Sequence, residues 1–407
     1  MSTVLERLPA DELKIRQRRC LGLFEAMHPD ASGILSFSLV NHYYLSGSPA
    51  QDGLLWLPRE GEPLLMVRKG IDRVRMESAL ARIVPFRSFG DVAGLCAEHG
   101  VPLGPVVGVE KGGLSWALGD MLSTKLKGVK LVDASPALTR SRAVKTAFEM
   151  KRMRETGRRH KEACEEIATL IQAGMTERQI MTAGWGTFVA RGYPGISRLS
   201  ALGREGVYGQ VSAGDNANFP ICTDGTIGYV GPHTSIPHFG SDTVWTEKAL
   251  LHHDTTFSYQ GYYSDKTQMF WSGAASSIPD AVRRAQDVCM DIEIRCSAML
   301  RPGTAPEEIW YVALDMAHKA GYADSFMGLG GNQVKYVGHG IGLEAEGFPV
   351  LAPSFTEPLQ EGMTLALEPK ISIRGMGMVG VENVFEITAE GGKSLSGDNF
   401  DIVCIDR

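Results

Sequence analysis

Four acidic side chains at apolar strand positions constrain this chain more than any other feature of its sequence. They are Asp254, Asp265, Glu368 and Glu382. Buried carboxylates that lie close together repel one another and lose their hydration, so cations must offset their charge. Four carboxylates bring about four negative charges, which two divalent cations neutralise. The imidazole of His339, in a glycine-rich segment, supplies one further ligand.

The segment around the two aspartates predicts a hairpin. Residues 257–263 (FSYQGYY) are strand-like on both sides of Gly261, which suits a tight turn. Asp254 and Asp265 lie at the two ends of this segment, so the returning strand brings their carboxylates together.

The two glutamates and the histidine lie in equally distinctive segments. Glu368 ends the apolar strand 363–368 and precedes Pro369, which interrupts strand pairing. Glu382 interrupts the predicted strand 379–387, and the glycines around His339 permit close backbone approach. Taken singly, such residues are more often turn, edge or solvated residues. Their combination favours a pair of metal ions that holds a hydroxide against a substrate carbonyl.

A chain of 407 residues is long enough for two domains. Short apolar runs at 33–37, 53–57, 63–67 and 105–110, with helices between them, predict an α/β domain over residues 1–140. Residues 146–407 predict an α+β domain. Its helix starts carry capping-box spacing at three places: Thr146 with Glu149, Thr176 with Gln179, and Thr304 with Glu307.

Composition excludes several classes of protein. A formal net charge of −6 and the lack of a long basic run argue against a nucleic-acid partner. No apolar run is long enough to cross a bilayer, and the charged N-terminus does not resemble a secretory signal. The seven cysteines are scattered and form no CxxC pair, so we expect a reducing cytoplasm.

The same segments resemble the metal motifs of the creatinase/prolidase/aminopeptidase P family. The similar strings are DTTFSYQGYYSDKT at 254–267, GHGIGLE at 338–344, LEP at 367–369 and GVENV at 380–384. Their order and spacing agree with the family from residue 146 onward. Weaker similarity extends to YYLSG at 43–47 and to residues 145–154.

This resemblance implies a pita-bread α+β catalytic domain behind a smaller creatinase-like α/β domain, commonly assembled as a homodimer. It also implies two divalent ions (Mn, Co, Fe or Zn) and cleavage of the peptide bond before proline by a metal-bridging hydroxide. The implied ligands are Asp254, Asp265, His339, Glu368 and Glu382. Asp265 and Glu382 would bridge the ions.

The resemblance further implies roles in proton transfer and substrate binding. Glu368 would handle the proton of the water. His238, in GPHTSIPH at 231–238, would face the substrate and stabilise the tetrahedral intermediate.

Three positions depart from the family pattern. Glu346 stands where proline-cleaving members carry a second histidine, and an ionised carboxylate only accepts hydrogen bonds. Glu346 would replace that catalytic histidine only when protonated. Gln268 replaces an arginine, and Lys335 stands where aminopeptidase P carries a histidine. We interpret these changes as affecting the substrate side of the site.

The main hypothesis is therefore a dinuclear hydrolase for Xaa-Pro peptides, either a dipeptidase or an aminopeptidase. One alternative keeps the fold and metals but acts on another small amide or a non-peptide substrate. Another is a non-catalytic binding protein that kept the fold. Metal content distinguishes the binding protein from the two enzymes.

Overall fold

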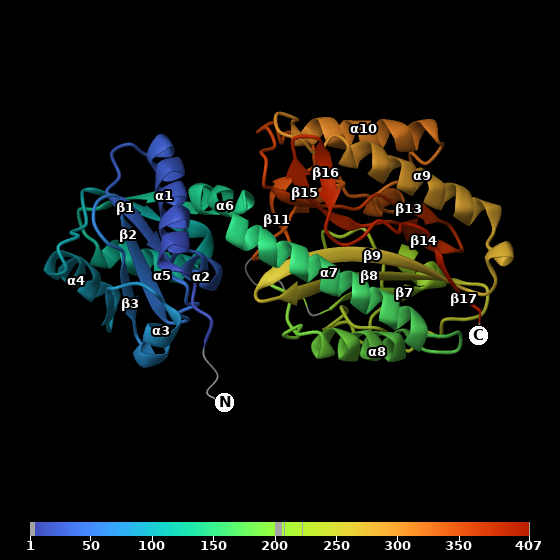
Figure 1. Ribbon diagram of the computed structural model, residues 1–407, viewed down its shortest axis with the longest axis horizontal. Helices are drawn as coiled ribbons and strands as arrows, with labels where there is room; N and C mark the ends of the chain where they lie inside the picture. The colour runs from blue at the N-terminus through green and yellow to red at the C-terminus, as the bar shows by residue number, and fades with distance from the viewer. Residues whose placement is uncertain (1–4, 200–205, 207, 222, 407) are drawn as a thin grey trace. The chain divides into compact units, whose positions relative to one another are not determined.

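The computed structural model describes residues 5–199, 206, 208–221 and 223–406 (Figure 1). Internal contacts divide the chain into two compact units, residues 1–142 and 143–407. This division falls between the two predicted domains, 1–140 and 146–407. Each unit is described by itself below.

The N-terminal unit is built on a six-stranded sheet with the order β4-β3-β2-β1-β5-β6. Strands β1 and β2 pair antiparallel, whereas β1, β5 and β6 run parallel. Its strands are β1 (Gly33–Ser36), β2 (Gly53–Pro58), β3 (Leu64–Val67), β4 (Ile83–Pro85), β5 (Val106–Val109) and β6 (Lys130–Asp133). Its helices are α1 (Ala10–Met27), α2 (Leu39–Ser46), α3 (Ile71–Glu77), α4 (Val92–Glu98), α5 (Trp116–Lys125) and α6 (Ser135–Ala143). The predicted α/β sheet is confirmed.

The C-terminal unit has two main sheets between two pairs of helices (Figure 1). One sheet has the order β17-β9-β8-β7, and α7 and α8 cover it. The other has the order β11-β10-β12-β15-β16; α9 and α10 pack against it and against the ribbon β13-β14. The helices are α7 (Ala147–Leu170), α8 (Glu177–Ala190), α9 (Asp280–Ser297) and α10 (Pro306–Lys319). This is the predicted pita-bread α+β architecture.

The strands of this unit place the acidic residues between the sheets. The strands of this unit are β7 (Gly209–Ala213), β8 (Leu250–Tyr259), β9 (Tyr262–Ser272), β10 (Gly338–Gly340), β11 (Gly347–Val350), β12 (Thr364–Leu367), β13 (Lys370–Ile373), β14 (Gly377–Gly380), β15 (Asn383–Thr388), β16 (Gly391–Ser394) and β17 (Val403–Ile405). Strand β8 contacts β14, and β9 contacts β12 and β15. Residues that lie where these strands contact each other are therefore shielded from water.

The predicted hairpin is confirmed and joins β8 to β9. Gln260 and Gly261 form its turn with φ values of 51° and 85°, as a two-residue turn with left-handed residues requires. Asp254 pairs with Thr267, and Asp265 pairs with Thr256. Since side chains alternate along a strand, the two aspartates share one face of the hairpin.

The predicted continuous strand 379–387 is wrong. Residues 377–380 belong to β14, which pairs with β13, whereas 383–388 belong to β15, which pairs with β12 and β16. Glu382 lies at the break and forms an isolated bridge with Thr267 of β9. The chain changes sheet there because its backbone bonds go to β9 instead of continuing either ladder.

Two of the three predicted capping boxes are confirmed. Thr146 caps α7 and Thr176 caps α8, each accepting a hydrogen bond from the backbone amide three residues on. The third box does not form, since the N-cap of α10 is Ala305, whose side chain has no oxygen; the Ala305 amide donates to Glu308 Oε1 at 3.4 Å. Pro306 fixes this start because proline suits the first helical position.

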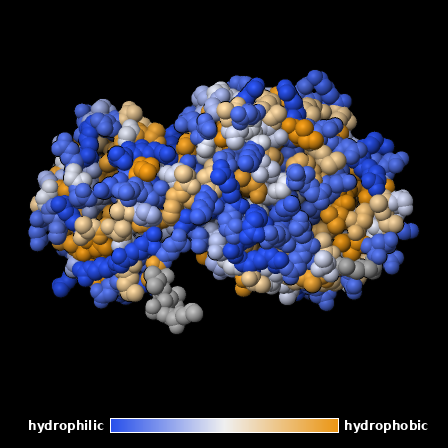
Figure 2. Space-filling view, in the orientation of Figure 1, coloured by the Kyte–Doolittle hydropathy of each residue, from blue (hydrophilic) through white to orange (hydrophobic). Residues whose placement is uncertain are grey.

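Helix α7 buries one face and exposes the other. Its exposed side carries ion pairs such as Arg158 with Glu155 and with Glu162. Figure 2 shows hydrophilic residues over the region where Figure 1 places this helix.

Among the described helices, none is both long enough and apolar enough to span a membrane.

Loss of the α8 cap gives a first prediction. Thr176→Ala removes the hydroxyl that accepts from the Gln179 amide at 3.2 Å. We expect it to lower the free energy of unfolding by about 1 kcal/mol, measured by urea denaturation. Thr182→Ala is the control, since its exposed hydroxyl donates to the Arg178 carbonyl one turn earlier in the same helix. An equal loss in both variants would contradict the capping role.

Candidate active site at a buried carboxylate cluster

The four predicted carboxylates meet between the sheets. Asp254 and Asp265 come from the hairpin, Glu368 follows β12, and Glu382 lies between β14 and β15. Glu368 and Glu382 are buried, and Thr267 donates a hydrogen bond to Glu382 Oε2 at 3.0 Å. The structure therefore brings together side chains that lie up to 128 residues apart in sequence, from Asp254 to Glu382.

A lysine that sequence analysis did not single out lies among them. Lys370 Nζ is 2.9 Å from Asp254 Oδ2, 2.7 Å from Glu368 Oε2 and 2.9 Å from Glu382 Oε2. Its side chain is only 1% exposed. The ammonium donates to three carboxylates that come from three separate segments.

The stem of Lys370 is enclosed as well. Lys370 pairs with Gly380 across β13 and β14. A β-carbon at position 380 would lie 2.6 Å from Lys370 Cγ, closer than two carbon atoms can approach. Gly380 therefore leaves the space in which the aliphatic chain of the lysine lies.

One ammonium among four carboxylates divides their pKa values. Burial would raise the pKa of Asp254, but the Lys370 and His252 charges outweigh it and the pKa is lowered. Burial and the Asp254 charge hold the pKa of Asp265 and of Glu382 well above the usual range. Burial opposes the charge of Lys370, but its three carboxylate partners raise the pKa of its ammonium. The cluster has a surplus of negative charge near Asp265 and Glu382.

That surplus coincides with a group of possible metal ligands. Asp265, His339 and Glu382 each offer a ligand atom, and these atoms lie within 4.8 Å of one another. His339 is 9% exposed, and its Nε2 is 3.6 Å from Glu368 Oε1. Ligands held about 2.1 Å from one ion are at most about 4.2 Å apart. These residues therefore fit one divalent ion after small side-chain adjustments.

The remaining implied ligands do not leave room for a second ion in the same way. One oxygen each of Asp254, Glu368 and Glu382 already accepts a hydrogen bond from Lys370. A cation bound to them would coincide with the ammonium nitrogen. The residues present thus fit one ion, and a second ion does not fit while Lys370 keeps these contacts.

Glu346 lies close enough to influence the cluster. Its charge is among those that raise the pKa of Asp265, after burial, Asp254 and Glu368. It also contributes to the raised pKa of Tyr336, whose hydroxyl donates to the Asp224 carbonyl at 3.0 Å. Tyr336 was not predicted as a site residue, and its position three residues before His339 was the only sequence clue.

His238 lies on a loop that the described contacts do not join to the carboxylates. Its Nδ1 is 3.2 Å from the Tyr229 hydroxyl, and the two rings are tilted against each other. Its assignment to substrate binding stays a prediction.

Gln268 does not face the site, which corrects our interpretation of this departure. The strand alternation puts Asp265 and Thr267 on one face of β9 and Gln268 on the other. Gln268 Nε2 donates to the carbonyl of Asp401 at 3.0 Å, so the residue anchors the C-terminal segment. Lys335 is exposed.

Behind the cluster lies a second buried network. Lys266 Nζ donates to Asn383 Oδ1 at 2.7 Å, and Asn383 Nδ2 donates to Glu293 Oε1 at 3.0 Å. Burial raises the pKa of Glu293 to about 8, although its bond from Asn383 and the charges of Lys266 and Lys370 lower it. Glu293 thus favours its protonated form in the folded protein.

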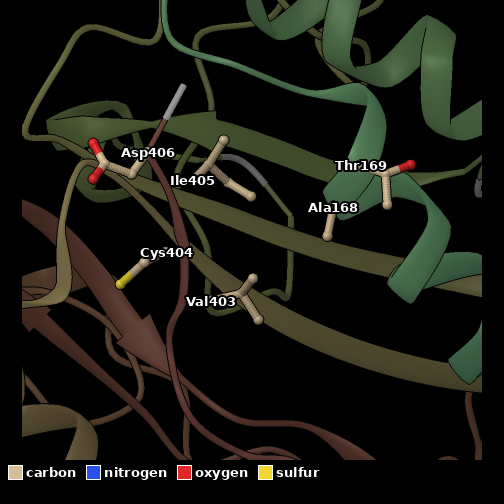
Figure 3. A pocket seen from close by; sticks show the side chains of 6 residues that line it. All are labelled: Ala168, Thr169, Val403, Cys404, Ile405 and Asp406. Carbon is tan, nitrogen blue, oxygen red and sulfur yellow. The ribbon is translucent and has the colours of Figure 1, made fainter.

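An open pocket of about 270 Å³ lies elsewhere in this unit. Figure 3 shows the six side chains that line it. The pocket is lined by Ala168 and Thr169 at the end of α7 and by Val403, Cys404, Ile405 and Asp406 along β17. None of these residues belongs to the carboxylate cluster, so the pocket is not the candidate site.

Fold and cluster together define a two-domain, pita-bread protein of the creatinase/prolidase/aminopeptidase P type. The chain belongs to metallopeptidase family M24, whose model matches residues 151–389. The creatinase/prolidase N-terminal domain matches residues 19–144.

Individual relatives are distant. The chain is 24% identical over 291 residues to the uncharacterized peptidase YqhT of Bacillus subtilis, covering 71% of this chain and 72% of the relative. It is 27% identical over 275 residues to a Xaa-Pro dipeptidase of Lactobacillus helveticus, covering 67% and 65%. A Xaa-Pro dipeptidase structure from Bacillus anthracis superposes with a TM-score of 0.80 at 19% identity, covering 97% of this chain and 100% of that one. At that identity the superposition shows the shared fold.

The raised pKa of Glu293 predicts a pH-dependent stability. Its pKa is about 8 in the folded protein and 4.5 without the fold, so the folded state binds more protons between these values. Stability therefore falls as pH rises through this window. Glu293→Gln removes the titration, and we expect its stability relative to wild type to increase from about pH 5 to about pH 8 in urea unfolding.

Asp287→Asn, at an exposed position of the same helix, is the control and should leave the pH profile unchanged. A Glu293→Gln variant whose stability difference does not change with pH would contradict the assignment.

Proposed function

We propose that this chain hydrolyses the amide bond of a small peptide-like substrate at the carboxylate cluster, with Xaa-Pro peptides as the first candidate substrates. The observation that carries the proposal is the grouping of Asp265, His339 and Glu382 beside Glu368. This set combines a site for one divalent ion with a carboxylate that can move a proton.

Membership of a metallopeptidase family supports the reaction class. The name of the Lactobacillus helveticus relative, Xaa-Pro dipeptidase, supports the bond cleaved, although the match covers just under two thirds of that protein. The choice between dipeptidase and aminopeptidase belongs to this proposal and awaits substrate tests. Homodimer assembly and a cytoplasmic location also stay predictions.

The side chains suggest separate roles in proton transfer and in ion binding. Glu368 Oε2 accepts from Lys370, which fixes the carboxylate, while Oε1 points toward His339 at 3.6 Å. Glu368 Oε1 is thus the atom placed to take a proton from an attacking water and to return it to the departing amine. A divalent ion held by Asp265, His339 and Glu382 would polarise the substrate carbonyl when bound.

The metal-bridging hydroxide implied by the resemblance needs two ions and is not part of this proposal. His238 remains a proposed contact to the substrate. Glu346 remains a proposed proton donor in place of the family's second histidine.

A second candidate substrate class is a small amide without proline. Glu346 favours it, because a carboxylate whose charge reaches Asp265 stands where proline-cleaving members carry an imidazole. A non-catalytic binding protein would retain the fold without turnover.

The activity test uses a panel of Xaa-Pro dipeptides, Xaa-Pro tripeptides and proline-free small amides, with amine release measured by chromatography. We expect turnover of at least one class and a loss of about 10²-fold or more in Glu368→Gln. Glu361→Gln, at an exposed position before β12, is the matched control. Turnover that is equal in wild type and Glu368→Gln, or no turnover of any class, would overturn the proposal.

Substrate preference gives a separate prediction at position 346. Glu346→His restores the imidazole that proline-cleaving members carry at this position, and we expect Xaa-Pro cleavage to rise by about tenfold or more through better proton donation. Glu344→His places the same substitution two residues earlier and should have no such effect. A Glu346→His variant without any gain would show that another residue limits proline cleavage.

A further inference from the structure

The cation among the carboxylates is a side chain of the protein itself. The Lys370 ammonium lies 2.7–2.9 Å from one oxygen each of Asp254, Glu368 and Glu382. These distances are those of charge-assisted hydrogen bonds. The same three residues belong to the five that sequence resemblance assigns to a two-ion centre.

We infer that the Lys370 ammonium permanently takes the place of one of the two divalent ions, so that this centre holds at most one metal ion. The inference rests on the proposed site, though not on its having activity. The inference concerns which cations balance the charge of the carboxylates, and the number of metal ions bound per chain tests it directly.

The geometry argues against a lysine that withdraws when a second ion arrives. Its side chain is 1% exposed, and its stem lies in the space that Gly380 leaves open. The Lys370 carbonyl also accepts from the Met327 amide at 2.8 Å, which holds its backbone. Withdrawal would move a buried charge away from three carboxylates into a packed interior, which is strongly unfavourable.

Charge is consistent with one ion. The ammonium and one divalent ion bring about three positive charges against four carboxylates, and one carboxyl proton offsets the remaining negative charge. A second divalent ion would instead leave about one positive charge, so the limit of one ion comes from the oxygens that Lys370 already contacts. The single divalent ion would bind Asp265, His339 and Glu382, whose ligand atoms already lie within 4.8 Å of one another.

Metal stoichiometry of the full chain tests this inference. Wild type, Lys370→Ala and Lys266→Ala are stripped with chelator, saturated with MnCl₂, desalted and measured by elemental mass spectrometry. We expect at most about one equivalent in wild type and about one more in Lys370→Ala. Lys266→Ala is the matched control because this buried ammonium contacts Asn383, an amide, and its loss should leave the count at the wild-type value.

Two results would overturn the inference. One is two equivalents of manganese in wild type, and the other is a Lys370→Ala variant that folds but gains none. The chelator dependence of the melting temperature is a second measure. EDTA should lower it more in Lys370→Ala than in wild type, because only the variant depends on ions to balance Asp254. An equal effect would also count against the inference.

If Lys370→Ala does not fold, wild-type crystals soaked in manganese decide the matter. At most one anomalous peak, with Lys370 Nζ still beside Asp254 and Glu382, supports the inference. Two peaks with the lysine displaced refute it. Failure of the hydrolysis assay with at most one ion bound would remove the proposed function and leave this inference standing.

Discussion

Carboxylates buried within reach of one another are tolerated only when cations lie among them, and the C-terminal domain is organised around that requirement. Asp254 belongs to one sheet, Glu368 follows a strand of the other, and Glu382 lies where the chain passes from the ribbon β13-β14 into that second sheet. Lys370 donates to all three. The ammonium is thus an electrostatic connection between the two sheets as well as part of the candidate site.

Much of the fold follows from local patterns. The hairpin turn at Gln260-Gly261 and the caps at Thr146 and Thr176 depend on a few neighbouring residues, so the sequence predicts them. The strand break at Glu382 is different. Glu382 interrupts the apolar run from Val379 to Ile387, but the local pattern does not show that the strand ends there, because the break accompanies a bridge to Thr267, 115 residues earlier. Tertiary pairing decides what local propensity leaves open.

The residues of the candidate site likewise differ in how far local sequence predicts them. The carboxylates could be predicted because acidic residues inside apolar strands are conspicuous, and resemblance placed His339 with them. Lys370 could not be predicted so readily, since lysine is almost always exposed and residues 370–373 (KISI) alternate like an edge strand. Gln268 carried a usable signal, because its odd spacing from Asp265 places it on the opposite face of β9.

The bare α-carbon of Gly380 has a consequence beyond packing. Any side chain there would collide with the stem of Lys370, and shortening the lysine would open a void against the glycine. The two positions are therefore coupled, because a side chain at position 380 needs the space in which the lysine stem lies. Among relatives of this chain, a larger residue at the position of Gly380 would mark proteins in which no ammonium reaches the cluster, and a glycine would mark those in which a lysine can reach it.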